Sequence, residues 1–160
     1  MTLALNKTEL KKQRDHLAMF QRFLPSLDLK RQQLLADYQR SKKVLAATEL
    51  EIESLLTSQH GLLSLLGASE QDFTELVSVQ SVTVNEENLL GVRLPVLGQL
   101  DFRTQEYSML ARPFWVDFLM ELLQAMATLH IRKQIDRTRL NRLDEAVRRI
   151  TQRVNLFEKV

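Results

Sequence analysis

Large apolar residues recur at intervals of seven at both ends of this chain. The residues at this spacing are Leu3, Leu10, Leu17 and Leu24 near the N-terminus and Trp115, Leu122, Leu129, Leu143, Ile150 and Phe157 near the C-terminus, where Leu129 and Leu143 are two intervals apart. A seven-residue apolar repeat buries one seam of a helix against a second helix and winds the two around each other. The repeat therefore predicts two long helices that pair into a rod.

The two repeats divide the chain into three segments. We expect an N-terminal coiled-coil helix over 1–60, a middle section over 61–112 and a C-terminal coiled-coil helix over 113–160. Only four glycines and three prolines occur in 160 residues, as long helices require. The predicted fold is all-α: a long antiparallel two-helix coiled coil, with a short helix and a small β-hairpin in the middle section.

Polar residues interrupt the apolar seam of each segment. In the C-terminal segment these residues are Lys133 and Asp136. If the segments pair antiparallel about the middle section, these positions fall near Asp37 and Arg40. We therefore expect crossed Asp37–Lys133 and Arg40–Asp136 pairs that fix the register of the two helices.

Two local signals modify the helical pattern. Pro25 lies inside the first segment, where a proline removes one backbone hydrogen bond and is expected to kink the helix near Arg22. Ser69 and Asp72 have the spacing of a capping box, which predicts a short helix through about Leu76.

The middle section also contains the pattern of a hairpin. Valines nearly alternate over Val77–Val84, which is typical of a strand. The polar run 85–88 predicts a turn, and Leu89–Val96 predicts a second strand that Pro95 restricts to a sheet edge. Such a hairpin is marginal alone, so we expect it to lean on the helices or on a partner.

The charge is unevenly distributed. The net charge is +6 over residues 1–48, −7 over 49–112 and +3 over 113–160. Solvated faces would explain this distribution, and so would a rod whose ends meet different partners. The basic stretch 132–153 could contact nucleic acid phosphates. However, it lacks interleaved aromatic residues and keeps the heptad phase, which favours an exposed face of a packed helix.

The sequence contains no pattern typical of catalysis. It has no glycine-rich phosphate loop and no cysteine, and its three histidines, His16, His60 and His130, are far apart. We therefore expect no catalytic, cofactor-binding or metal-binding residues. A polar N-terminus and the absence of a long apolar run predict a cytoplasmic protein without membrane insertion.

Three aromatic residues, Phe114, Trp115 and Phe118, open the last helix. One helical turn cannot bury all three against a single partner helix. They could pack against the hairpin, or they could form a docking patch for another protein.

Four motifs resemble the D subunit of V-type and A-type rotary ATPases. Residues 152–158 resemble its RRVNALE signature, 88–95 its NVAGVxLP segment, 27–31 its LLKxKR stretch, and Asn6-Lys7-Thr8 with Leu10 its TKxxL opening. The motifs follow in the family's order over essentially the whole chain. Gln152 replaces an arginine of the signature, and Leu156-Phe157 replaces Ala-Leu. In the family the chain continues for tens of residues beyond the signature, so the C-terminal helix here is either cut short or naturally short.

The resemblance implies the rotor axle of the central stalk, which transmits torque between an A/B ring and the membrane rotor and has no nucleotide site. Its implied partners are subunits A, B and F and the subunit that connects to the membrane rotor, in a complex peripheral to the membrane. We expect four residues to face the A/B ring: Arg148, Arg149, Arg153 and Asn155. We expect six to face the F subunit or the stalk base: Gly91, Leu94, Pro95, Phe114, Trp115 and Phe118. The alternatives are a coiled-coil scaffold unrelated to rotation and a basic helical hairpin that binds nucleic acid.

Overall fold

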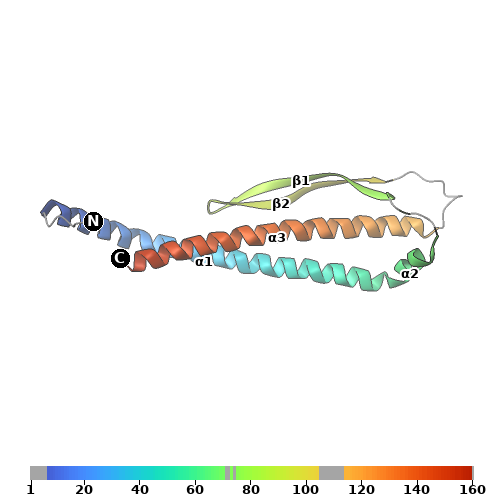
Figure 1. Cartoon of the computed structure of the whole chain (residues 1–160), viewed down its shortest axis with the longest axis horizontal. Helices are drawn as coiled ribbons and strands as arrows, with labels where there is room; N and C mark the ends of the chain where they lie inside the picture. Colours follow the sequence, from blue (N-terminus) through green and yellow to red (C-terminus); the bar gives the residue numbers. More distant parts are fainter. Residues whose placement is uncertain (1–6, 71–72, 74, 105–113, 160) are drawn as a thin grey trace.

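Two long helices lie side by side in the computed structural model, which describes residues 7–70, 73, 75–104 and 114–159. They are α1 (Lys7–Ser58) and α3 (Val116–Glu158), and their antiparallel arrangement places both chain ends at the same end of the rod (Figure 1). A short helix, α2 (His60–Ala68), follows α1, and an antiparallel hairpin of β1 (Val77–Leu89) and β2 (Val92–Thr104) runs along α3. The mostly helical fold with a small two-stranded sheet confirms that part of the prediction.

The apolar seam follows the predicted spacing where both long helices are present. Every seam position of the repeat from residue 24 to 55 and from residue 115 to 157 is buried or half-buried. Leu34 and Leu143 are 1% and 0% exposed and belong to the same core cluster. The heptad pattern therefore identified the faces by which α1 and α3 meet.

The N-terminal part of the repeat behaves differently. Leu10 and Leu17 are 56% and 42% exposed. The ring of Phe20 meets that of Phe157 at a centroid distance of 4.9 Å, and α3 ends one residue later at Glu158. Among the described residues, α1 thus has no helical partner before Phe20, and the expectation that these leucines are buried is wrong.

The predicted crossed ion pairs are also wrong. Lys133 Nζ lies 3.0 Å from Glu49 Oε1, and Arg40 pairs at 2.9 Å with Asp37 on its own helix. The register is therefore shifted from the predicted one, because the apolar layers and the length of the middle section position the helices. Asp136 instead lies near Thr48, which is 2% exposed and donates to the Val44 carbonyl at 3.2 Å.

Burial on the seam raises the pKa of Asp136, and the positive charges of Arg132 and Arg139 and the Thr48 hydroxyl oppose this shift only in part. Its Oδ2 atom has no hydrogen-bond partner among the described residues. At a pH just above the ordinary pKa of aspartate, the Asp136 carboxyl still holds its proton in the folded chain but has released it in the unfolded chain. The stability contributed by protonated Asp136 is therefore present below that pKa and is lost as the pH rises through the raised pKa.

We predict that Asp136→Leu raises the free energy of unfolding by about 1 kcal/mol at pH 7, because it removes a half-buried carboxylate whose Oδ2 atom has no hydrogen-bond partner among the described residues. The gain should be smaller at pH 4, where the wild-type carboxyl is partly protonated. Urea unfolding at both pH values measures the difference. Asp136→Asn is the control, because asparagine has the shape of aspartate but does not titrate. An equal gain in the free energy of unfolding for Asp136→Leu at both pH values would contradict the prediction.

The short helix precedes its predicted position. Helix α2 ends at Ala68, and the backbone N–H of Ser69 donates to the Leu66 carbonyl at 3.2 Å. Ser69 therefore ends a helix instead of starting one, while Asp72 lies outside the described residues. Helix α1 continues through Pro25, so this proline does not end the helix.

The hairpin turn lies at Leu90 and Gly91, later than predicted. Their φ angles are 52° and 86°, the left-handed values of a two-residue hairpin turn, and the Gly91 N–H donates to Asn88 Oδ1 at 2.9 Å. Residues 85–88, predicted as the turn, belong to β1 and pair with residues 93–96. The predicted edge position of Pro95 is confirmed, since β2 pairs only with β1 in the two-stranded sheet.

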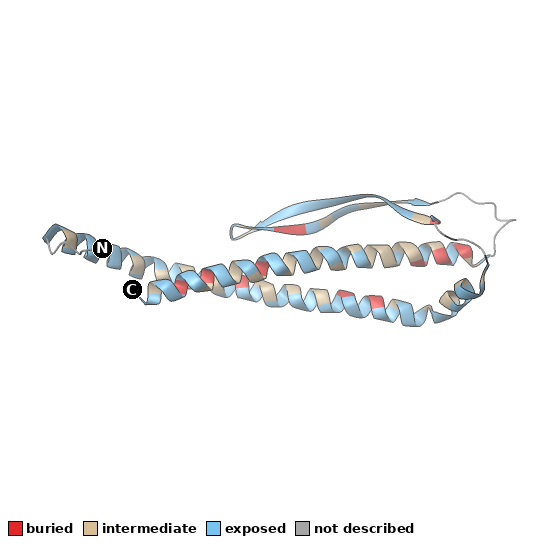
Figure 2. Cartoon of the chain, in the orientation of Figure 1, coloured by how far each residue is buried: buried red, intermediate tan, exposed pale blue. Residues whose placement is uncertain are grey.

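The hairpin is anchored near its tip. Leu94 of β2 is 0% exposed and joins Leu34 of α1 and Leu143 and Ile150 of α3 in one cluster. Figure 2 shows this buried segment of β2 above the shaft, whereas most of the hairpin is exposed. This apolar cluster therefore connects the tip to both long helices.

Candidate partner-binding surfaces

Ion pairs hold the hairpin beside the basic stretch of α3. Arg139 lies 3.0 Å from Glu87, and Arg142 lies 3.5 Å from Glu86 while donating to the Arg93 carbonyl at 2.9 Å. The hairpin thus partly neutralises the cations that sequence analysis considered for nucleic acid binding.

A groove opens where the hairpin tip meets the two long helices. We define this tip groove by an apolar floor of Leu34, Leu90 and Ile150 and a basic rim of Lys30, Arg93 and Arg153. Its volume is about 360 Å³. Residues from α1, the hairpin and α3 contribute to it, so it exists only when the hairpin is docked. Sequence reasoning missed Lys30 and Arg93, because no local pattern shows that these distant segments meet.

The four residues expected to face an A/B ring lie on the last turns of α3, and all are exposed. Arg149 and Arg153 both line the tip groove. Arg148 does not line it and pairs at 2.9 Å with Asp144, and Asn155 is also outside it. The structure therefore divides the four residues between two faces of one helix.

Two of the three aromatic residues at the start of α3 are exposed. Phe114 and Phe118 are 85% and 60% exposed. Trp115 is half-buried, and its ring lies 5.3 Å from that of Phe73. Trp115 therefore packs on a residue that precedes the hairpin, and not on the hairpin as one interpretation had it. The exposed phenylalanines are available to a partner, so a docking patch there stays a prediction.

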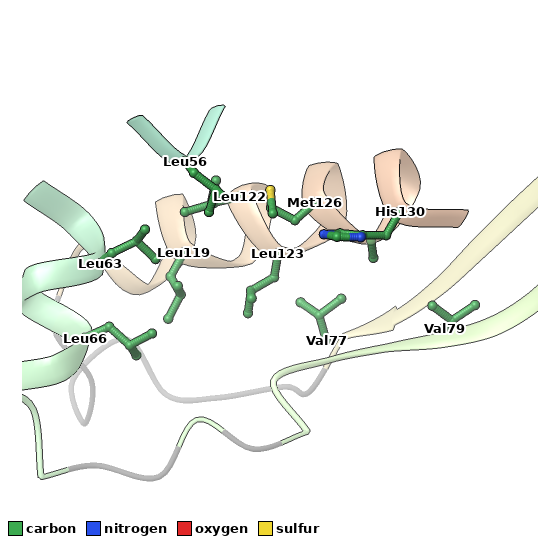
Figure 3. A pocket seen from close by; sticks show the side chains of 11 residues that line it. Leu56, Leu63, Leu66, Val77, Val79, Leu119, Leu122, Leu123, Met126 and His130 are labelled. Atoms are coloured by element: carbon green, nitrogen blue, oxygen red, sulfur yellow. The ribbon is translucent and has the colours of Figure 1, made fainter. Parts of the chain in front are cut away.

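An apolar cavity of about 440 Å³ lies beside this aromatic cluster. Leu63 and Leu66 of α2, Leu119 and Leu123 of α3, and Val77 of β1 surround it, and Figure 3 shows these side chains around one open space. We name this feature the base cavity. Together with Phe114 and Phe118, it gives the end of the rod opposite the chain termini an apolar surface.

The six residues assigned to one partner surface do not lie together. Gly91, Leu94 and Pro95 are at the hairpin tip, beside Leu143 and Ile150 of α3, whereas the three aromatic residues are at the beginning of that helix. The prediction placed the whole hairpin at the base, but only its open end is there (Figure 1). Leu94 and Pro95 are buried within the chain, so of these three residues only Gly91 is exposed.

In the described part of the chain, no cluster of three or more histidine, aspartate or glutamate side chains could hold a metal ion. Within the same residues, no helix is long and apolar enough to cross a membrane.

A family model for the ATP synthase D subunit matches residues 9–160. The chain belongs to the ATP synthase D-subunit family. The match covers both long helices and the hairpin between them, which agrees with the motifs found along the whole sequence.

Relatives of this D-subunit family member are each named as the D subunit of a V-type ATP synthase. The protein of Borreliella burgdorferi is 32% identical over 158 residues, covering 99% of this chain and 78% of the relative. The protein of Chlamydia trachomatis is 30% identical, covering 98% and 78%, and that of Chlamydia pneumoniae is 27% identical, covering 97% and 75%.

Proposed function

We propose that this chain is the rotor axle in the central stalk of a V-type or A-type rotary ATPase. In this role α1 and α3 wind into a coiled coil that transmits torque between the A/B ring and the membrane rotor. The observation that carries the proposal is the apolar seam of a rod-shaped member of the D-subunit family. Every position of this seam from residue 24 to 55 is buried or half-buried. A continuous core gives the torsional stiffness that an axle needs.

The two ends of the rod suit different partners. The end near the chain termini carries Arg148, Arg149, Arg153 and Asn155, which we assign to the A/B ring. The opposite end, within and beside residues 61–112, carries Phe114 and Phe118 and the base cavity, which we assign to the F subunit and the connecting subunit. The chain itself performs no catalysis in this proposal, and it works in the cytoplasm at the membrane surface.

Affinity purification of the tagged chain from its native host tests membership of the complex. We expect subunits A, B and F to be recovered with it. Recovery of a different stable assembly, without A and B, would favour the scaffold alternative and overturn the proposal.

Cross-linking tests rotation itself, and the absence of natural cysteines from this chain means that a single introduced cysteine is its only thiol. Asn155→Cys, labelled with a photoactivated cross-linker in the assembled complex, should bond to A or B and stop ATP hydrolysis in proportion to the cross-linked fraction. Gln80→Cys, on the exposed hairpin, is the labelling control. Full hydrolysis after complete cross-linking at residue 155 would show that this chain does not turn within the ring.

A further inference from the structure

The tip groove has unpaired cations from three separate elements. Lys30 of α1, Arg93 of β2 and Arg153 of α3 line it, and among the described residues none of their side chains forms an ion pair. Arg142, Arg149 and Glu145 also line the groove, but these are paired, since Arg142 pairs with Glu86 and Arg149 with Glu145. Three like charges gathered around one opening repel each other, so an anionic occupant would relieve this repulsion.

The floor of the groove is apolar. Leu34 and Ile150 are nearly buried at 1% and 6% exposure, while Leu90 remains 38% exposed. An occupant that only supplied negative charge would leave the exposed part of Leu90 in contact with water. The composition of the groove therefore favours an occupant with both anionic groups and an apolar group.

Leu90 is an unfavourable residue for its own position. Its φ of 52° lies in the left-handed region, which is unfavourable for a residue with a branched side chain and suits asparagine or glycine better. Its side chain is also partly exposed, so burial within the chain does not fully compensate. A residue that opposes local backbone preference while lining a groove is a candidate for binding.

We propose that the tip groove binds an acidic protein segment that inserts one large apolar side chain. The apolar side chain would cover Leu90, and flanking carboxylates would meet Lys30, Arg93 and Arg153. A volume of about 360 Å³ lies at the small end of the range for ligand pockets, which suits one anchoring side chain. The proposal does not depend on the rotor assignment, because it concerns the chemistry of the segment and not the protein that carries it.

The test uses the full chain and a labelled synthetic peptide in which one leucine is flanked by glutamates. Fluorescence anisotropy at physiological salt should show saturable binding. The variant K30E/R93E/R153E should weaken it at least about tenfold, since each exposed pair contributes about 0.2–1 kcal/mol and reversal adds repulsion. The matched control K43E/R103E/R137E changes the same charge on the same three elements outside the groove, and should have less than about a twofold effect.

Leu90→Asn tests the floor without changing charge. It should weaken peptide binding at least about threefold while keeping or raising the stability of the hairpin, because asparagine tolerates the left-handed conformation. Replacing the leucine of the peptide by serine should weaken binding similarly.

Three results would overturn the proposal. The first is an equal loss of binding in the matched control, which would indicate attraction to net charge alone. The second is binding that is indifferent to Leu90→Asn and to the peptide leucine. The third is equally effective competition by inorganic polyphosphate or a DNA oligonucleotide, which would assign the groove to phosphate-rich anions instead of a protein segment.

Discussion

Leu94→Asp is expected to release the hairpin from the shaft while leaving α1 and α3 paired. The side chain of Leu94 is 0% exposed and contacts a cluster formed by Leu34, Leu143 and Ile150. An unpaired carboxylate at this position would lose the apolar contacts and bear the cost of burial. The other links include Leu89 and Val92, which are half-buried against the same cluster, the hydrogen bond from Arg142 to the Arg93 carbonyl, and the ion pairs of Arg139 and Arg142, and each of these contributes less than the fully buried Leu94.

Leu94→Ala should loosen the hairpin in the same way but to a smaller extent, because it removes the apolar contacts without burying a charge. Removing a buried leucine side chain costs about 2–5 kcal/mol, so hydrogen exchange of the β1 and β2 amides should accelerate about 30-fold or more. An isolated two-stranded hairpin is marginal, so the released strands should lose their protection together. Amides of α1 on the seam near Ile52 should change far less, because Ile52 does not belong to the cluster that Leu94 joins.

Val96→Ala is the control for Leu94, since Val96 is on the same strand but 37% exposed. It should change hairpin exchange less than about fivefold. Uniform acceleration across α1, α3 and the hairpin in Leu94→Ala would contradict the prediction, because it would mean that the hairpin is integral to the shaft instead of docked on it.

The heptad seam could be predicted because its cause is local. Spacing alone places Leu34 and Leu143 on inward faces, and both are buried. The register of α1 against α3 was not predictable in the same way. It depends on which apolar layers of the two helices meet, and the length and fold of the middle section between them decide this. The expected Asp37–Lys133 pair therefore failed, and Lys133 meets Glu49 instead.

The turn was misplaced for a different physical reason. Polar residues 85–88 have the composition of a turn, but a two-residue hairpin turn requires left-handed φ values, which Gly91 readily supplies. Attention to this glycine would have extended both strands and brought Arg93 beside α3. The tip groove would still have been missed, because the approach of Lys30 and Arg153 to the turn depends on the register of α1 against α3.

The exposed aromatic residues at the base give the second large expected effect. Phe114→Ser combined with Phe118→Ser should weaken binding to the F subunit or the connecting subunit about 100-fold or more, because buried aromatic anchors at interfaces each contribute about 2 kcal/mol or more. The free chain should lose little stability, since these side chains are 85% and 60% exposed. Trp115 is left unchanged because it packs on Phe73.

Calorimetric titration of the purified partner subunits into the chain measures this loss. Leu156→Ser is the control, because Leu156 is also an apolar residue of α3, 64% exposed, but lies at the opposite end of the helix. If the double phenylalanine variant binds both subunits normally while Leu156→Ser does not, the base partners dock at the other end of the rod. That result would reverse the polarity proposed for the axle, since the end that carries Phe114 and Phe118 would then point into the ring and the end near the chain termini toward the membrane.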